Sequence, residues 1–384
     1  MSQLSPYFAV NRQKALAQWR EFLPQTPKYG EQRNFVNPGH SQVSRLSPAI
    51  RCRLMLEDEI VSETLAAYPL AKVEKWVQEV CWRRYWKGWL ECRPGVWTDY
   101  LERLQNAKHS EATLQRARDV AAGQSGVAVM DRFARELVET GYLHNHARMW
   151  FASFWIHVER LPWELGAEFF FQHLLDGDAA SNTCSWRWVA GLQTAGKTYL
   201  IRRSNLDKYC GPEYLADETG LERLNDDVVT SVETEETADL KPAKAAVWPT
   251  NLPKFSSPTG LWIHDEDLSA EISGVLAGMD FAGIFRSTPI TVGVEQAKYR
   301  QAAMGVPTEN LTNLVEWAVS EGLSNVVAYA PFIGPLNDKV ESLREDLMKE
   351  NVGLNLIRRE SDTRIFPMAW KGFFPFWEAM RKKL

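Results

Sequence analysis

The sequence predicts a mainly α-helical domain followed by a small α/β domain. Apolar residues recur at intervals of three and four over much of residues 1–210, which is the spacing of one helix face. Residues 211–258 are first acidic and then rich in proline, as is typical of a linker. From residue 259 to 384, short apolar runs alternate with helical patterns, which favours a mainly parallel, Rossmann-like sheet.

Five stretches in the first part show the helical spacing most clearly, and turn residues such as Pro94-Gly95 separate them. They are residues 56–70, 73–90, 127–141, 143–159 and 164–175. In the last part we expect strands at 261–263, 282–285, 325–329 and 354–357, and helices at 268–279, 311–322, 336–350 and 369–383. No Gly-x-Gly-x-x-Gly follows a predicted strand, so this sheet is not expected to hold a dinucleotide.

Composition narrows the class of protein. The chain has 384 residues, enough for two domains, and a net charge of −5, so it is not a general nucleic-acid binder. Its five cysteines are widely spaced and include no C-x-x-C pair, which favours a reducing cytoplasm and argues against a metal site. No apolar run is long enough to cross a bilayer and the N-terminus lacks a signal-peptide pattern, so we expect a cytoplasmic protein without a membrane partner.

A local basic cluster stands out against the acidic total. It consists of Lys72, Lys75, Arg83, Arg84 and Lys87. Such a cluster can bind phosphates beneath a net negative charge. It can equally be the solvated face of a helix, and the sequence leaves both interpretations open.

Two polar segments are hard to explain as core packing. Residues 140–154 read T-G-Y-L-H-N-H-A-R-M-W-F-A-S-F, and residues 176–188 read D-G-D-A-A-S-N-T-C-S-W-R-W. Buried Asp, Asn and Arg each need partners, so a plain core would use Leu, Ile and Val instead. Together with Y-G-E-Q-R-N at 29–34, S-R-L-S-P at 44–48 and W-V-Q-E-V-C-W-R at 76–83, the chain resembles the all-helical FAD-binding domain of the photolyase/cryptochrome superfamily over residues 10–205.

The resemblance implies that the helical domain holds FAD non-covalently. Arg148 and Asp176 match an arginine–carboxylate pair beside the flavin ring, and Asn182 matches the position facing flavin N5, where an amide favours the reduced anionic flavin. The implied cofactor-binding residues are Tyr29, Ser44, Leu46, Ser47, Asn145, Arg148, Asp176, Asp178 and Asn182. Val43 replaces a usual threonine. The alternatives are that residues 44–48 and Asp178 serve only as helix caps.

The resemblance also implies a substrate, which is DNA that contains a cyclobutane pyrimidine dimer. The family members that repair this lesion use five side chains that the chain keeps, namely Glu79, Trp82, Asn145, Met149 and Trp188. Two pairs of them are spaced i,i+3 and i,i+4, so each pair shares a helix face. The branch that repairs (6-4) lesions normally has His where Asn145 stands, so we favour the cyclobutane lesion and expect a structural role for His144.

Electron supply to the flavin follows tryptophans in this family. Trp186 and Trp163 match the first two, and with Glu79 and Asn182 they complete the predicted catalytic set. Two residues along a helix subtend about 200°, so Trp186 and Trp188 are expected to face opposite sides. The distal position holds Arg103 rather than Trp, and Tyr100, Trp97 or Trp155 are candidate substitutes.

Other departures mark an atypical member. Arg84 replaces a usual acid, residues 51–53 replace a small glycine-containing stretch, and residues 198–209 replace the common ending. Residues 261–268 and 335–358 resemble parts of the α/β antenna domain, which normally comes first in these proteins. We therefore expect an order without an N-terminal antenna domain, in which 259–384 is either a permuted antenna-like domain or an unrelated α/β domain.

Three functions follow from these observations. The leading hypothesis is a light-driven lyase that repairs pyrimidine dimers in damaged DNA by electron transfer from reduced FAD. The alternatives are a cryptochrome-like blue-light photoreceptor and a flavoprotein that has lost its light chemistry and serves as a binding scaffold. The sequence identifies no second, antenna chromophore.

Overall fold

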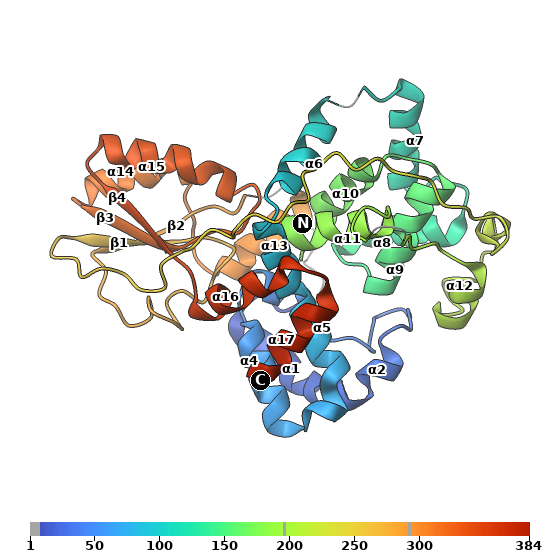
Figure 1. Cartoon of the computed structure of the whole chain (residues 1–384), viewed down its shortest axis with the longest axis horizontal. Coiled ribbons are helices and arrows are strands. Elements are labelled where there is room, and N and C mark those ends of the chain that lie inside the picture. The colour runs from blue at the N-terminus through green and yellow to red at the C-terminus, as the bar shows by residue number, and fades with distance from the viewer. Residues whose placement is uncertain (1–7, 107, 195–196, 291–292) are drawn as a thin grey trace.

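The computed structural model describes residues 8–106, 108–194, 197–290 and 293–384, and it shows a helical part beside a smaller α/β part (Figure 1). The predicted fold class is confirmed, because helices fill the first part and a four-stranded parallel sheet lies in the second. The helices of the first part are α1 (Arg12–Phe22), α2 (Tyr29–Gln32), α3 (Ser47–Arg51), α4 (Glu57–Ala67), α5 (Leu70–Glu91), α6 (Gly95–Asn106), α7 (Glu111–Ala121), α8 (Ala128–Thr140), α9 (Asn145–Ser153), α10 (Trp163–His173), α11 (Ala179–Val189) and α12 (Arg203–Tyr209).

Helix α5 is the long central helix of the helical part. Pro69 precedes it in extended backbone and Pro94 follows it, so proline marks both ends. Its 22 residues pack against α4, α11 and the C-terminal helices. Gly88 allows one of these contacts, because a Cβ there would lie 2.8 Å from the backbone of Phe366. The C-terminus of the chain is thereby fixed to the helix that carries Glu79 and Trp82.

Helices α10 and α11 form the second packing centre. Gly166 of α10 faces the indole of Trp186 on α11, and a Cβ at this position would come within 2.4 Å of the ring. Trp186 also meets Phe170 edge-on, with ring centroids 5.0 Å apart. The glycine therefore sets how closely the two helices approach and lets them bury Trp186.

The sheet of the α/β part has the strand order β2-β1-β3-β4, all parallel. The strands are β1 (Thr259–Ile263), β2 (Gly283–Arg286), β3 (Asn325–Tyr329) and β4 (Gly353–Ile357), and the helices are α13 (Val294–Met304), α14 (Leu314–Ser320), α15 (Val340–Lys349), α16 (Glu360–Ile365) and α17 (Phe373–Met380). Leu314, Leu343 and Leu347 of α14 and α15 share a core with Trp262 and Val326 of the sheet. The other face packs against turns in the region of residues 252–281 and the end of α13.

Two expectations for this part were wrong, and one helix was missed. Residues 268–279 form turns rather than a helix, because Gly274 and Gly278 adopt left-handed φ of 86° and 77° that interrupt any helical run. Helix α13 was not predicted at all. The helix expected at 369–383 is broken at Lys371-Gly372 into a 3₁₀ turn, α17 and a final 3₁₀ turn.

The segment 211–258 crosses the surface between the two parts and is tied down along its length. Val232 N donates to His157 Nδ1 at 3.1 Å, and Ala243 N donates to the Cys92 carbonyl at 2.8 Å. Arg187, which is fully buried, forms an ion pair with Glu236. Among the described residues, no helix is long and apolar enough to cross a membrane.

Buried ion pairs join the α/β part to the helical part. Arg51 Nη1 lies 2.5 Å from Asp265 Oδ2, in the loop after β1. Arg53 bridges Asp267 at 3.1 Å and Asp362 at 2.5 Å. Burial would raise the pKa values of these three carboxyl groups, but the facing arginines hold them below their usual range. The unusual arginines at 51 and 53 therefore bind the C-terminal part of the same chain.

Candidate functional site

Helix α9 begins at the centre of the predicted site. Its N-cap is His144, whose Nδ1 accepts a hydrogen bond from His146 N at 3.1 Å. Burial lowers the pKa of His144 well below its usual value, and the nearby His40 and His146 add to this effect. The ring is therefore a neutral acceptor that caps the helix, as its expected structural role requires.

Arg148, one turn into α9, forms the predicted pair with Asp176. Its Nη1 lies 3.1 Å from Asp176 Oδ2, and its Nε donates to the Leu143 carbonyl at 2.7 Å. Arg83 of α5 approaches the same carboxylate at 3.6 Å. Burial would raise the pKa of Asp176, but the charges of Arg148 and Arg83 and a hydrogen bond from Ser47 hold it below its usual value. Asp176 is thus a buried anion held by three elements.

Asp178 is the N-cap of α11. Its side chain accepts from Ser181 N at 2.8 Å and forms an ion pair with Arg83. Burial is outweighed by Arg83, Lys87 and Ser181, so the pKa of Asp178 is also lowered. The helix-cap interpretation therefore applies to Asp178, and its predicted contact with the flavin stays a prediction.

Three further predicted residues are deeply buried on α10 and α11. Asn182 Nδ2 donates to the Ala167 carbonyl at 2.8 Å, which fixes the orientation of the amide. Trp163 and Trp186 are each 2% exposed, and neither indole N–H has a hydrogen-bond partner within the described part of the chain. Both tryptophan rings are therefore buried, and neither is fixed by a hydrogen bond to the described residues.

The loop predicted to hold the phosphate side lies before α3. Leu46 is buried, and its N–H donates weakly to Ser44 Oγ at 3.4 Å. Helix α3 starts at Ser47 with no side-chain capping bond, so the two hydroxyls do not act as its caps. Tyr29 packs edge-on against Trp76, with centroids 5.1 Å apart, in an aromatic cluster nearby.

The five predicted lesion contacts are less buried than the flavin set. Asn145 is exposed, and the other four are half-buried. Glu79 forms an ion pair with Arg33, and burial raises the pKa of Glu79 while Arg33 and Lys75 offset part of that rise. Trp188 contacts Tyr199 at 5.5 Å between centroids, and it is more exposed than Trp186, as their helical spacing predicted.

Trp82 has an unexpected partner. The ring of Phe373, from α17, stacks on its indole with centroids 3.7 Å apart and planes 6° apart. Tyr85 meets the same phenyl ring edge-on. No local pattern in the sequence indicates this stack, because the two rings are separated by most of the chain.

Most of the basic cluster does not form a phosphate-binding groove. Arg83 is bound to two aspartates, Arg84 is 2% exposed and donates to Asp58 at 2.7 Å, and Lys87 is 3% exposed. These three side chains are bound to carboxylates or buried, so neither the phosphate-binding interpretation nor the solvated-face interpretation applies to them. Only Lys72 and Lys75 of the cluster are exposed.

A cavity of about 340 Å³ borders the predicted cofactor loop. This volume is within the range of small-molecule sites. Tyr142 lines this cavity, and the Arg148 guanidinium lies 5.4 Å from the centroid of the tyrosine ring. Its charged and aromatic lining includes Phe8, His40, Arg45, Arg132, Arg135, Glu136, Tyr142 and Tyr214. Arginines beside a loop of small hydroxyl residues suit a phosphate-bearing ligand.

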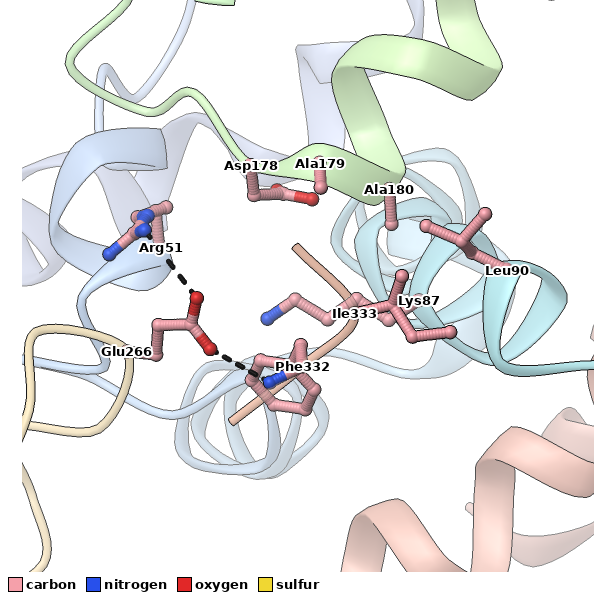
Figure 2. Close-up of a pocket in the computed structure, with 9 residues that line it drawn as sticks. All are labelled: Arg51, Lys87, Leu90, Asp178, Ala179, Ala180, Glu266, Phe332 and Ile333. Carbon is pink, nitrogen blue, oxygen red and sulfur yellow. Dashed lines mark hydrogen bonds and ion pairs between the residues drawn. The ribbon is translucent and has the colours of Figure 1, made fainter. Parts of the chain in front are cut away.

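A second, much smaller cavity lies where the two parts meet. Figure 2 shows Lys87 pointing into it beneath the N-terminus of α11, opposite Arg51, Glu266 and Phe332. Its volume of about 10 Å³ is enough for about one water molecule. The cavity lies beyond the carboxyl ends of β1 and β3, where the strand order reverses and ligands of open α/β sheets usually bind. Here the helical part closes that position.

An aromatic path leads away from Trp163. Tyr100 lies 5.8 Å from it and 5.3 Å from Trp97, centroid to centroid. The Tyr100 hydroxyl donates to Glu168 Oε2 at 2.7 Å. Arg103 pairs with Asp99 and Trp155 meets Trp186 instead, so Tyr100 and Trp97 are the candidate substitutes that extend the path from Trp163.

Comparisons with known proteins identify the helical part. Residues 76–209 match the family model described as the FAD binding domain of DNA photolyase. The deoxyribodipyrimidine photo-lyase of Escherichia coli (strain K12) is 29% identical over 207 residues, covering 50% of this chain and 42% of that protein. The photo-lyase of Thermus thermophilus is 33% identical over 198 residues, covering 48% and 44%. A cryptochrome of Synechocystis sp. PCC6803 aligns with a TM-score of 0.48 at 22% identity, over 56% of this chain and 45% of its own.

The helical part is therefore a flavin-binding type of domain with a buried arginine–aspartate centre. Its residues 76–209 match the FAD-binding domain of DNA photolyase. The chain spans less than half the length of the curated relatives it matches.

The residues of the site fit FAD. Asp176 Oδ1 is buried and accepts no hydrogen bond from the residues that the structure describes, although Arg148 lies 3.1 Å away as an ion-pair partner. A buried carboxylate oxygen with a free lone pair suits the ring N–H of a flavin. The hydroxyls of the 44–47 loop and the adjoining arginine-lined cavity suit its phosphates.

Proposed function

We propose that this protein is a light-driven DNA repair flavoprotein that binds FAD and splits cyclobutane pyrimidine dimers. One observation carries the proposal. On helix α9, Arg148 is bound to the buried Asp176, while Asn145 is exposed and Met149 is half-buried on the same helix. A single helix thus supplies a closed polar centre for a cofactor and a polar, accessible edge for a substrate.

The residues of the closed centre would hold and tune the cofactor. When bound in its reduced form, FAD would supply one electron to the pyrimidine dimer under blue light. That electron would return to the flavin after both carbon–carbon bonds that join the pyrimidines have broken. Arg148 and Asp176 would orient the ring, Ser47 would hold Asp176 in place, and Ser44 would bind the phosphate side. Asn182 has no acidic proton to donate, so it would leave a reduced anionic ring unprotonated.

The accessible residues would bind the lesion. Trp82 and Trp188 offer aromatic surface on which unstacked pyrimidines of a flipped dimer can pack. Asn145 and Met149 share one helix face, at a spacing of i,i+4. Glu79, whose pKa is raised, holds a proton over a wider pH range than an ordinary glutamate and can share it with a thymine carbonyl.

Repair in light tests the proposal directly. Purified protein reconstituted with FAD and reduced chemically is expected to convert a dimer-containing oligonucleotide to the undamaged form under blue light and not in darkness. Trp188→Ala should lose repair while keeping its flavin, because Trp188 lies among the accessible residues. Flavin binding without repair by the wild type would contradict the proposal.

A cryptochrome-like photoreceptor is the second candidate. It is favoured by the stack of Phe373 on Trp82, which covers one face of a predicted lesion contact. In this case blue light would change protease resistance or exposure of residues 366–384 in FAD-loaded protein that shows no repair.

Electron supply would use Trp186, Trp163 and then Tyr100. Tyr100 lies next to Trp163, and Glu168 is placed to accept the phenolic proton when the tyrosine is oxidised. Tyr100→Phe is therefore expected to slow photoreduction of the bound flavin by an external thiol. Repair by chemically reduced protein should be retained, and equal loss of both activities would argue against this path.

A reducing cytoplasm remains the proposed location. All five cysteines are buried and free of disulfides in the described structure. Nothing in the proposed chemistry requires an oxidising compartment.

A further inference from the structure

The C-terminal segment runs antiparallel to α5. Arg93 Nη2, just after the end of α5, donates to the Trp370 carbonyl at 2.7 Å. Tyr85, further back along the helix, donates to the Lys371 carbonyl at 3.0 Å. Near the start of α5, Glu74 accepts from Trp377 Nε1 at 2.9 Å. The segment therefore covers almost the whole length of the helix that carries Glu79 and Trp82, as Figure 1 shows for α17 beside α5.

Some aromatic rings of this segment face α5 and others face solvent. Phe373, Phe376 and Trp377 are buried, at 5% exposure or less. Trp370 and Phe374 are 51% and 68% exposed. Phe373, Phe376 and Trp377 occupy the side of the segment that packs on α5. Trp370 and Phe374 point to other sides of the segment and are therefore exposed.

One of the exposed rings, Phe374, is continuous with the predicted lesion contact. The Phe374 ring lies 5.9 Å from that of Phe373, which stacks on Trp82. Single exposed apolar residues are normal on protein surfaces, but an exposed ring that is joined through Phe373 to a predicted base-stacking residue is not explained by packing.

The same segment is basic within an acidic protein. Residues 370–384 contain Lys371, Arg381, Lys382 and Lys383 against one acid, Glu378, while the whole chain carries a net charge of −5. Lys371 Nζ lies 4.3 Å above the Trp370 ring. Arg381 is engaged with Glu378 at 3.3 Å and Glu74 at 3.8 Å, so the exposed lysines supply the positive field.

We propose that Trp370, Lys371, Phe374 and the Lys382–Lys383 pair form a surface that binds single-stranded nucleic acid beside Trp82. Exposed rings stack on the faces of bases, and these faces are accessible only in an unpaired strand. Lys371 beside Trp370, together with Lys382 and Lys383 at the end of the same segment, can attract the phosphates that link those bases. Aromatic rings interleaved with cations are the combination that sequence-independent strand binding requires.

This surface extends the proposed function, because it would bind the unpaired strand on either side of a flipped dimer. The role given to Trp82 rests on that function. The binding of an undamaged strand in darkness does not, since it needs neither flavin nor lesion. The two proposals can therefore fail separately.

Binding of a labelled oligothymidylate, followed by fluorescence anisotropy in darkness, tests the surface. Trp370→Ala and Phe374→Ala should each weaken binding by at least about fivefold, the loss for one base stack. Met348→Ala is the matched control, because Met348 is also 68% exposed but lies on α15. Thermal unfolding should be unchanged in all three, since each side chain faces solvent.

The lysines have their own readout. Each lysine that binds a single-strand phosphate contributes about 0.7 to the slope of log K against log salt concentration. Lys382→Ala combined with Lys383→Ala should therefore reduce that slope by about 1.4. Lys339→Ala, exposed in the α/β part, should leave the slope unchanged.

Two results would overturn the proposal. One is wild-type affinity for oligothymidylate in both aromatic variants. The other is a loss of concentration-dependent self-association in sedimentation runs with no loss of strand binding, which would make the surface a contact between copies of this chain. Normal strand binding without dimer repair in light would leave this surface intact and reject the proposed function alone.

Discussion

The predicted flavin-binding residues and the predicted lesion-binding residues differ in their burial and in the ion pairs that they form. The flavin set is centred on the buried Asp176, and its charged members are bound into ion pairs that join α5, α9 and the start of α11. The lesion set, drawn partly from the same helices, is exposed or half-buried and makes few hydrogen bonds. A cofactor that stays bound can be built into the fold, whereas a substrate that enters and leaves needs side chains that the fold does not require. Mutations should therefore separate the two sets by their effect on stability.

The largest effect is expected at Asp176. Asp176→Ala leaves Arg148 without its carboxylate, whereas Arg83 keeps its pair with Asp178, and breaking a largely buried pair in this way costs about 3 kcal/mol. We expect the free energy of unfolding in urea to fall by about that amount and the bound flavin to be lost. If Asp176→Ala unfolds like the wild type, the flavin set is not part of the stabilising core.

Trp82→Ala should weaken binding of the lesion and leave the bound flavin in place, which is the opposite of the result expected for Asp176→Ala. Losing one base–aromatic stack weakens binding to a dimer-containing oligonucleotide by about 1–3 kcal/mol. Flavin content should not change, because Trp82 contacts Phe373 and not the Arg148–Asp176 centre. Titration of damaged and undamaged oligonucleotides measures the difference, and unchanged affinity for the damaged one would remove Trp82 from the lesion set.

The pH dependence of stability should also have opposite signs in the two sets. The lowered pKa values of Asp176 and Asp178 mean that their stabilisation is present above the unfolded value of about 4 and is lost as the pH falls through the folded value. The raised pKa of Glu79 means that its contribution is present below about 4 and is lost as the pH rises through the folded value.

Glu79→Gln isolates this difference. The glutamine cannot titrate, so the variant should gain stability relative to the wild type as the pH rises from about 4 to about 7. Asp178→Asn should lose relative stability in a different window, as the pH rises to about 4 and the wild-type carboxylate becomes charged. Urea unfolding at several pH values below and above about 4 gives both trends, and parallel curves for Glu79→Gln and the wild type would show that Glu79 is not perturbed by its surroundings.

Local features were predictable from the sequence, whereas contacts between distant segments were not. The spacing of apolar residues indicated α5 and α8, and the run at 325–329 matched β3. Lys87 could not be placed inside, because nothing local reveals that Phe332 covers it from the other part of the chain. Arg51 was recognisable only as a departure from the family pattern, since its partner Asp265 is 214 residues away. Periodicity reports which face of an element is buried but does not identify what buries it.

The smallest effect is expected at Asn145, and Asn182 provides its matched control. Both are asparagines of the predicted cofactor set, but Asn182 is 7% exposed and donates to the Ala167 carbonyl, whereas Asn145 is exposed at the first position of α9. Asn182→Ala removes this buried hydrogen bond and leaves a small cavity, and should cost about 1–2 kcal/mol of unfolding free energy. Asn145→Ala should change that free energy by no more than about 0.5 kcal/mol, as is usual for surface positions. Its effect should appear instead as weaker binding of the dimer, by about 1 kcal/mol for one hydrogen bond. Equal destabilisation by the two variants in urea would mean that exposure does not distinguish cofactor residues from substrate residues in this protein.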